Sequence, residues 1–153
     1  MKKFLITDKS EIEEIIFKAK VCALALISDN KPYCVPMNFG YSDGIIYLHG
    51  APDGKKMAAL KENPEVCLSF YIDDNLHVVN ENIACSYSMK FRSVLASGRV
   101  VFVNDIHEKE KILNIIMKNY TERSGFKYSK PALENVCVYY LKPTELTAYK
   151  RGY

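Results

Sequence analysis

One stretch of the sequence sets glycine, proline and two lysines directly before an expected helix: His49-Gly50-Ala51-Pro52-Asp53-Gly54-Lys55-Lys56-Met57. The first N–H groups of a helix have no partner inside the helix and lie at the positive end of its dipole, so they can bind a phosphate. Lys55 and Lys56 add positive charge where each cation alone costs roughly 0.3–1 kcal/mol, which favours a compensating anion. The alternative is a pair of solvated surface lysines.

A second stretch lies one expected hairpin upstream: Pro36-Met37-Asn38-Phe39-Gly40-Tyr41. Extended backbone with proline, methionine and phenylalanine can cover a flat, mostly apolar ring and can supply N–H donors to its polar edge. The isoalloxazine ring of a flavin has this character. The two stretches together are consistent with a cofactor that carries both a phosphate and a flat ring.

Histidine and arginine are the other residue types that could take part in chemistry. His49, at a strand end before glycine, is either a structural histidine or a group that stabilises negative charge or hands over a proton. Arg92 is either a solvated residue that faces outward or a clamp for phosphate, whose geometry a guanidinium matches. His77 and His107 have no partners at ligand spacing, so no metal site is expected.

Composition describes one globular domain over residues 1–153, with 48% hydrophobic and 25% charged residues. The formal net charge of +3 is too small and too evenly spread for a nucleic-acid surface. The apolar run after Met1 is too short for a signal peptide, and no stretch is long enough for a membrane span. Five cysteines without a C-x-x-C pair indicate reduced, buried thiols and hence a cytoplasmic protein.

Periodicity then predicts the first elements of structure. A helix is expected from Asp8, with Ile12, Ile15, Ile16 and Ala19 on one face. Strands are expected over residues 21–28, 33–41 and 45–49, joined by tight turns into an antiparallel meander. A short helix around residues 57–60 and a strand over 66–72 follow, and the polar stretch 73–82 is expected to be irregular.

The remainder of the chain follows the same logic. Residues 86–103 are expected to form one bent strand or two strands, with Gly98 at the bend. Helices are expected from about 106 to 120 and over 128–135, and a last strand over 136–149 is interrupted at Lys142-Pro143. Six or so mostly antiparallel strands with three to four helices predict a mainly β fold, a small barrel with peripheral helices, and argue against a doubly wound sheet.

At this point the sequence resembles a known family. The run K-P-Y-C-V-P-M-N-F-G-Y-S-D-G-I-I-Y-L-H-G-A-P-D-G-K-K-M-A-A-L-K-E-N-P-E-V-C-L is similar to the FMN-binding pyridoxamine phosphate oxidase superfamily, and within it to the nitroimidazole-resistance (nitroimidazole reductase-like) proteins. Further matches are A-C-S at residues 84–86, Y-S-M-K-F-R-S-V-L-A-S-G at 87–98 and M-K-N-Y-T at 117–121. The similarity covers most of the chain.

The resemblance implies a split β-barrel, a homodimer, and FMN bound in the cleft between the subunits. It implies that Lys56, next to Lys55, reaches the FMN phosphate, assisted by Arg92 and Ser93. The segment Pro36, Met37, Asn38 and Phe39 would lie along the flavin ring, and His49 would sit near its reactive side as the catalytic residue.

The resulting hypothesis is an FMN-dependent oxidoreductase that takes electrons from a nicotinamide or another donor and passes them to a small acceptor, with nitroaromatic compounds as one class. Pyridoxamine phosphate oxidase proper is disfavoured, because its C-terminal Arg-His-type motif is missing from L-K-P-T-E-L-T-A-Y-K-R-G-Y. Open alternatives are a deazaflavin- or haem-binding relative and a flavin carrier or sensor without turnover. A dimeric barrel without cofactor would leave Gly54-Lys55-Lys56 unexplained.

Overall fold

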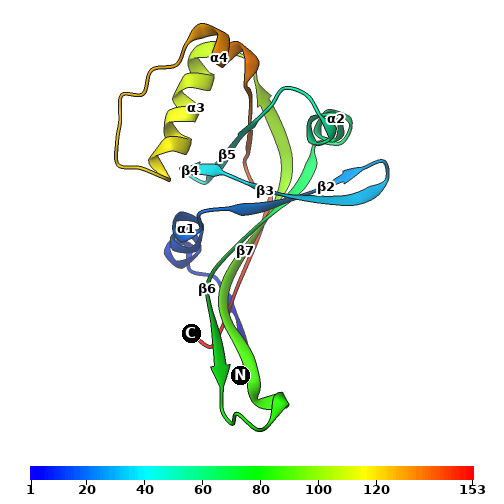
Figure 1. The fold of residues 1–153 in the computed structure, drawn as a ribbon, viewed down its shortest axis with the longest axis vertical. Coiled ribbons are helices and arrows are strands. Elements are labelled where there is room, and N and C mark those ends of the chain that lie inside the picture. Colours follow the sequence, from blue (N-terminus) through cyan, green and yellow to red (C-terminus); the bar gives the residue numbers. More distant parts are fainter.

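Apolar runs separated by turns divide the chain into nine strands, with four helices between them (Figure 1). The computed structural model describes residues 1–153. The strands are β1 (Lys3–Ile6), β2 (Cys22–Ser28), β3 (Lys31–Met37), β4 (Phe39–Ser42), β5 (Ile45–Gly50), β6 (Glu65–Val78), β7 (Tyr87–Val103), β8 (Cys137–Leu141) and β9 (Glu145–Arg151). The helices are α1 (Lys9–Lys18), α2 (Lys55–Glu62), α3 (Ile106–Lys118) and α4 (Lys130–Asn135), and a short 3-10 turn spans Ala84–Ser86.

The sheet is built around β7. Hydrogen bonds join the strands in the order β3-β2-β6-β7-β8-β5-β4, and β9 pairs with both β7 and β1. Every pairing is antiparallel. On one edge β7 pairs first with β9, over Phe91–Ser97, and then with β8, over Val100–Val103. One bent strand therefore serves both parts of the sheet, and the predicted mainly β split barrel with peripheral helices is confirmed.

The change of partner along β7 occurs at Gly98. A Cβ atom there would lie 3.1 Å from Leu141 Cδ1 and 3.3 Å from the backbone nitrogen of Thr144. The absence of a side chain lets the turn between β8 and β9 approach β7, and Thr144 N–H donates to the Ser97 carbonyl at 2.9 Å. The bend predicted at this glycine is confirmed.

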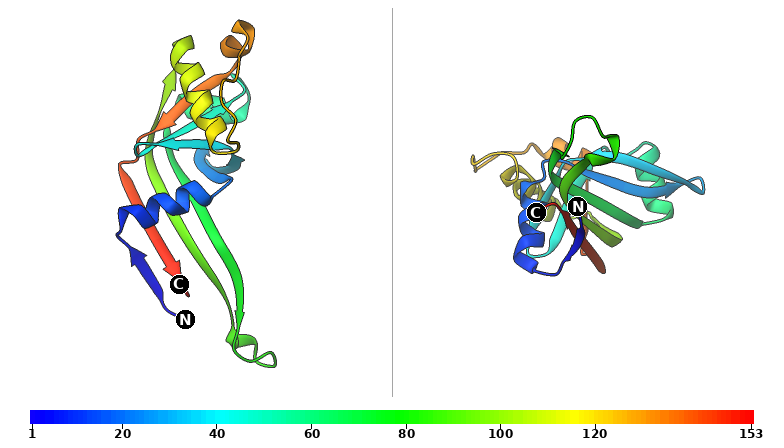
Figure 2. Two further views of the ribbon diagram at one scale, coloured as in Figure 1. Left: turned by 90° about the vertical axis from the view of Figure 1, so that its left-hand side faces the viewer. Right: turned by 90° about the horizontal axis from the view of Figure 1, so that it is seen from below.

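Three of the four helices, α1, α3 and α4, begin at a side chain that caps them, and the helices lie against the sheet (Figure 2). Asp8 accepts a hydrogen bond of 2.8 Å from the Glu11 N–H, and α1 then buries Ile15 and Ile16 in the main core, on the side of β6 and β7. Asp105 caps α3 in the same way, and α3 lies across β4 and β5. The core therefore fills the space enclosed by the sheet and these helices.

The strand expected over residues 33–41 is in fact two strands. Asn38 interrupts it: β3 pairs with β2, whereas β4 pairs with β5, with Phe39 opposite Leu48. The simple meander is therefore corrected, because the chain crosses from one part of the sheet to the other at Asn38. The last strand expected over 136–149 is likewise two, β8 and β9, on different stretches of β7.

The stretch expected to be irregular continues β6 instead. A bulge shifts the register between Ile72 and Asn75, with Asp73 at a φ of 57°, and β6 then runs to Val78 opposite β7. The N-terminal strand β1 was not anticipated, and it pairs only with β9. The larger number of strands comes from these splits and additions.

The five cysteines are all free, but only Cys22 is buried. Cys34 and Cys85 are exposed, which corrects the expectation of buried thiols, because Cys34 points away from the core on β3 and Cys85 lies in the 3-10 turn. None of the helices has both the length and the apolar character to cross a membrane.

Candidate functional site

Four segments that are distant in sequence meet at one corner of the barrel. Gly50 at the end of β5 pairs with Cys137 at the start of β8, and α2 begins five residues after Gly50. From α2, the Lys56 side chain reaches over Gly50 to Met37 at the end of β3. We call this group of residues the corner site: Met37, Asn38, His49, Gly50, Lys56 and Cys137.

The start of α2 leaves its backbone donors available. Gly54 precedes the helix with a φ of 89°, a conformation that favours glycine, and no side chain caps the first turn. Ala58 N–H is the first to bond back, to the Gly54 carbonyl at 3.0 Å. The N–H groups before it and the positive end of the dipole therefore suit an anion.

The structure separates the two lysines at this helix start. Lys56 Nζ lies 3.1 Å from Met37 Sδ, and a Cβ atom at Gly50 would lie 2.9 Å from the same Nζ. No carboxylate lies within 4.0 Å of Lys56, and burial lowers the pKa of its ammonium group. Lys55 is exposed and lies over the Tyr33 ring, 4.8 Å from its centroid. Lys56 is thus the half-buried charge that lacks a counterion.

His49 is the member of the corner site that lies on the opposite face of β5 from Gly50. Alternation along a strand puts His49 and Gly50 on opposite faces, and His49 is paired with Val138. Burial lowers the pKa of His49, and the charge of Lys56 lowers it further. The ring is therefore neutral at pH 7, which differs from the partly protonated imidazole that the charge-stabilising role requires.

The interior beside the corner site contains polar groups without a full set of partners. Tyr139, two residues after Cys137 on β8, is completely buried and its hydroxyl has no hydrogen-bond partner. Burial raises the pKa values of the Tyr139 phenol and the Cys137 thiol, so both are neutral at pH 7. Cys22 Sγ lies 3.6 Å from the Met37 carbonyl, and its pKa is raised to about 12 by burial. Lys56 is therefore the one charged group among these neighbours.

The break at Asn38 is held in place by a distant loop. Tyr120, just after α3, accepts a hydrogen bond of 2.9 Å from Phe39 N–H and donates one of 3.0 Å to the Lys20 carbonyl. Asn119 Nδ2 donates to the Phe39 carbonyl at 3.3 Å. The two polar groups of the Phe39 backbone thus have side-chain partners, and Asn38, which belongs to neither strand, is fixed beside Met37.

A groove runs along the neighbouring face of β2 and β3. Its volume is about 420 Å³. Its lining is mostly apolar: Lys20, Val21, Cys22, Ala23, Cys34, Val35, Pro36 and Tyr71. A volume of this size falls within the range of about 300–1,000 Å³ that is usual for cofactor and small-ligand sites. Pro36 lies in the groove, while Met37, the next residue, points into the barrel toward Lys56.

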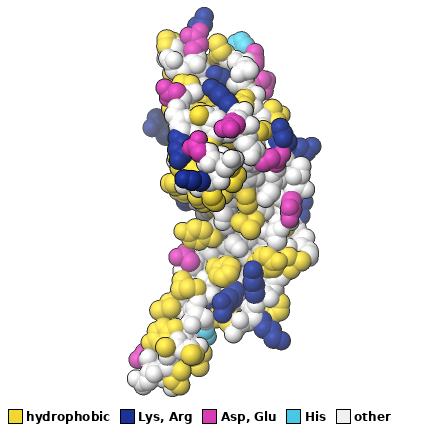
Figure 3. Space-filling model, turned by 90° about the vertical axis from the view of Figure 1, so that its right-hand side faces the viewer, with side chains coloured by type: hydrophobic (Ala, Val, Ile, Leu, Met, Phe, Trp, Pro, Cys, Tyr) yellow, Lys and Arg dark blue, Asp and Glu magenta, His cyan; other side chains and the backbone are white.

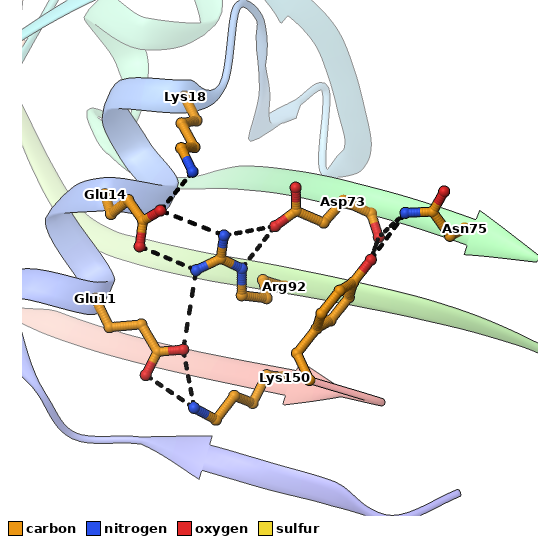
Figure 4. A network of polar contacts seen from close by, with 8 residues as sticks. Glu11, Glu14, Lys18, Asp73, Asn75, Arg92 and Lys150 are labelled. Carbon is orange, nitrogen blue, oxygen red and sulfur yellow. Dashed lines mark hydrogen bonds and ion pairs between the residues drawn. The ribbon is translucent and has the colours of Figure 1, made fainter.

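Arg92 and Ser93 lie away from the corner site. Met37 is on β3 and these two residues are on β7, three strands further along the sheet, which is roughly 14 Å. The Arg92 guanidinium contacts Asp73 at 2.6 Å and Glu14 at 3.1 Å, with Glu11 at 4.0 Å (Figure 4). It is neither solvated nor free to clamp a phosphate within this subunit, because carboxylates already occupy its donors.

Two features near the site were not predicted from the sequence: the buried Tyr139, and the pair Asn119 and Tyr120. Tyr139 has no local signal, since an apolar strand contains many tyrosines that are merely core residues. Asn119 and Tyr120 did belong to the matched run M-K-N-Y-T, but their contact with Phe39 spans about 80 residues of sequence. No three His, Cys, Asp or Glu side chains are grouped so as to hold a metal ion.

The fold and the site define a class: a split β-barrel protein with a cationic corner next to a ligand-sized groove. The chain belongs to the pyridoxamine 5'-phosphate oxidase family, whose model matches residues 8–150. No curated protein matches the sequence.

Solved structures extend this comparison. A proposed 5-nitroimidazole antibiotic resistance protein from Bacteroides thetaiotaomicron has 39% identity and a TM-score of 0.86, over 97% of this chain and 87% of that one. A flavocytochrome from Azotobacter vinelandii has 22% identity and a TM-score of 0.83, over 97% and 70%. An FAD- and haem-binding protein from Mycobacterium smegmatis has 15% identity and a TM-score of 0.84, over 100% and 75%. The last two comparisons demonstrate a shared fold.

Proposed function

We propose that the protein is an FMN-dependent oxidoreductase that acts as a homodimer on a small acceptor. The observation that carries this proposal is Lys56, a half-buried lysine without a carboxylate partner, beside the uncapped start of α2. A buried charge is normally paired, so the arrangement favours an anionic ligand. The phosphate of FMN supplies such a group.

The residues of the corner site suit FMN. Lys56 and the first N–H groups of α2 would hold the phosphate, and Pro36, Met37, Asn38 and Phe39 would lie along the ring. Bound FMN would supply the transfer of electrons from a nicotinamide or another donor to the acceptor.

Two side chains that were assigned to the site take different roles in this proposal. Lys55, exposed over Tyr33, would contribute long-range attraction rather than a direct contact. His49, neutral at pH 7, would use its one ring N–H as a hydrogen-bond donor to the substrate at the end of β5. Arg92 faces α1 and would have no direct contact with FMN, whereas Ser93 would need to act on a site formed with a second subunit.

Nitroimidazoles are the acceptor class that we propose first. The support is the 39% identity to a structure whose description concerns 5-nitroimidazole resistance. A nitro group is flat and electron-poor, and a ring that carries one can stack on an apolar wall such as the Pro36 side of the groove. Absorbance during anaerobic reduction with a nicotinamide, followed by addition of a nitroimidazole, tests donor and acceptor in turn.

The homodimer is supported by one uncovered side of the sheet, which we call the outer face. It is the side of β2, β3, β6, β7 and β9 that points away from α1, and alternation assigns to it Ala23, Ala25, Ile27, Pro32, Cys34, Pro36, Cys67, Ser69, Tyr71, Phe91, Ser93, Leu95 and Tyr149. Hydrophobic side chains are spread along much of this side in Figure 3. Large uncovered apolar faces usually mark protein interfaces, and a cofactor groove on this face would lie between the subunits.

The decisive experiment compares two neighbouring lysines. Lys56→Ala should weaken FMN by roughly 10- to 150-fold, the equivalent of a charge-assisted hydrogen bond of about 1.5–3 kcal/mol. Riboflavin, which lacks the phosphate, should bind the variant and the parent protein equally. Lys55→Ala removes the same charge one residue away and is the matched control, with a small effect expected because Lys55 is exposed.

Fluorescence titration of each variant with FMN and riboflavin measures these affinities. Equal weakening of both flavins in Lys56→Ala would remove the phosphate role of Lys56. A protein that binds neither flavin would refute the proposal as a whole, and a haem absorbance band in the purified protein would redirect it to the haem-binding members of this fold.

A further inference from the structure

The strands β6 and β7 extend beyond the barrel as a two-stranded arm, residues 73–90, at the bottom of Figure 1. The register of the arm gives it two different faces. Leu76 lies opposite Met89 and Val78 opposite Tyr87 on one face. Asn75 lies opposite Lys90 and His77 opposite Ser88 on the other. The arm is therefore amphipathic, with an apolar face of four side chains.

Nothing in the subunit covers this apolar face. Leu76 is 64% exposed, Met89 and Tyr87 are each 43% exposed, and Val78 is half-buried. Isolated exposed apolar residues are common, but apolar side chains that face the same way on a projecting hairpin form a patch, and such patches mark interaction sites. The polar face differs, because Tyr153 bonds there to Asn75.

The apolar face of the arm continues the outer face of the sheet. Along β7 the same alternation passes from Tyr87 and Met89 to Phe91 and Leu95 without a break, because the bulge lies on β6 alone. Figure 3 shows hydrophobic side chains from the middle of this side down to the end of the arm. A partner that covers the outer face would thus also meet the arm.

The base of the arm is held by a network of ion pairs (Figure 4). Arg92 on β7 binds Asp73 at the bulge and Glu14 on α1, and Lys150 on β9 binds Glu11 on α1 at 3.0 Å. The Tyr153 hydroxyl donates to the Asp73 carbonyl at 2.6 Å. Four elements fix the direction of the arm, which lowers the entropy that a partner must remove on binding.

We propose that the arm of each subunit packs its apolar face, Leu76, Val78, Tyr87 and Met89, on a second copy of this chain. The inference rests on the homodimer proposed above and assigns it a part outside the barrel. The distribution of charge supports a second copy as the partner. Lys3 and Arg151 lie opposite each other on β1 and β9 at the arm end of the outer face, and neither forms an ion pair with a carboxylate. Glu145, at the opposite end of β9, forms no ion pair either.

A twofold axis across the outer face would bring unlike charges together. In such an interface both subunits contribute the same surface, and the two β9 strands run in opposite directions. The Glu145 end of one β9 therefore faces the Arg151 end of the other.

The test is a pair of double variants on the same arm. Leu76→Asp with Met89→Asp places two charges on the apolar face and should raise the dimer dissociation constant at least tenfold. His77→Asp with Ser88→Asp places the same charges on the polar face, and there the dissociation constant should change less than threefold. Sedimentation equilibrium measures both against the parent protein, and circular dichroism establishes that each variant is folded.

Equal dissociation constants for the two double variants would overturn the inference. A parent protein that stays monomeric at micromolar concentration would overturn it as well. Titration of the parent protein with FMN separates these results from the proposed activity. If the dimer binds FMN but its dissociation constant is the same for both double variants, only the arm contact is refuted. If the dimer does not bind FMN, the oxidoreductase proposal is refuted, and the two double variants alone decide whether the arm contact exists.

Discussion

Tyr120→Phe removes a single oxygen atom, and we expect that oxygen to support both the fold and the corner site. It accepts from Phe39 N–H at 2.9 Å and donates to the Lys20 carbonyl at 3.0 Å. Without it the Phe39 N–H loses its partner next to a completely buried side chain, at a cost of about 1–3 kcal/mol. The Lys20 carbonyl lies at an exposed position, where water can replace the lost donor at little cost.

We therefore expect Tyr120→Phe to lower the free energy of unfolding by about 1–2 kcal/mol, or the melting temperature by about 2–4 °C for each kcal/mol in a chain of this size. Urea unfolding followed by circular dichroism measures the change. The same variant should bind FMN more weakly at a temperature where it is fully folded, because Asn38 and Met37 lose the anchor that follows them. Fluorescence titration measures this second effect.

Tyr128→Phe is the matched control, since it deletes the same atom where the only hydrogen bond is a long one of 3.5 Å to Asn114. Its free energy of unfolding and its FMN affinity should stay close to those of the parent protein. If Tyr120→Phe and Tyr128→Phe behave alike in both assays, the anchoring role of Tyr120 is refuted. If Tyr120→Phe loses stability but keeps its FMN affinity, Tyr120 supports the fold and does not position the corner site.

Two further predictions follow from close packing and from titration. Gly40→Ala should destabilise the protein by about 1–3 kcal/mol in urea unfolding, because the new Cβ would lie 2.8 Å from the Ile116 Cα in α3. Gly50→Ala should cost less, since its Cβ meets only the mobile end of Lys56, and equal losses would contradict the reasoning. For His49, burial and Lys56 lower the pKa in the folded state, so the unfolded chain takes up the proton first as the pH falls below about 6.5. Stability should decline between pH 7.5 and 5.5, and His49→Gln should decline less; parallel declines would show that His49 is not responsible.

The sequence could predict what local pattern controls. The start of a helix at Asp8, the apolar stripe of α1, the bend at Gly98 and the lysines at the start of α2 all depend on residues within a few positions of one another. Which of two adjacent lysines turns inward could not be predicted, because Lys56 is selected by Met37 and Gly50, which lie on other elements.

The features that could not be predicted depend on contacts between distant residues or on a bulge that shifts the inward and outward alternation of side chains along a strand. The break at Asn38 is compatible with a continuous strand until Asn119 and Tyr120 bind the backbone of Phe39. The arm was hidden because the bulge between Ile72 and Asn75 changes which residues of β6 face outward, so a search for a period of two stops there. The role of Arg92 could not be decided from the sequence because the three carboxylates that contact it come from α1 and from the bulge in β6.

The position of β9 between β1 and β7 has a consequence for synthesis of the protein on the ribosome. Lys3–Ile6 emerges well before its one strand partner, Glu145–Arg151, which follows nearly 140 residues later. At about 5–20 residues per second, β1 waits roughly 7–28 s for that partner. During this interval Phe4 and Leu5 belong to an unpaired strand, so the nascent chain offers a binding segment to chaperones that the finished protein no longer presents in that form.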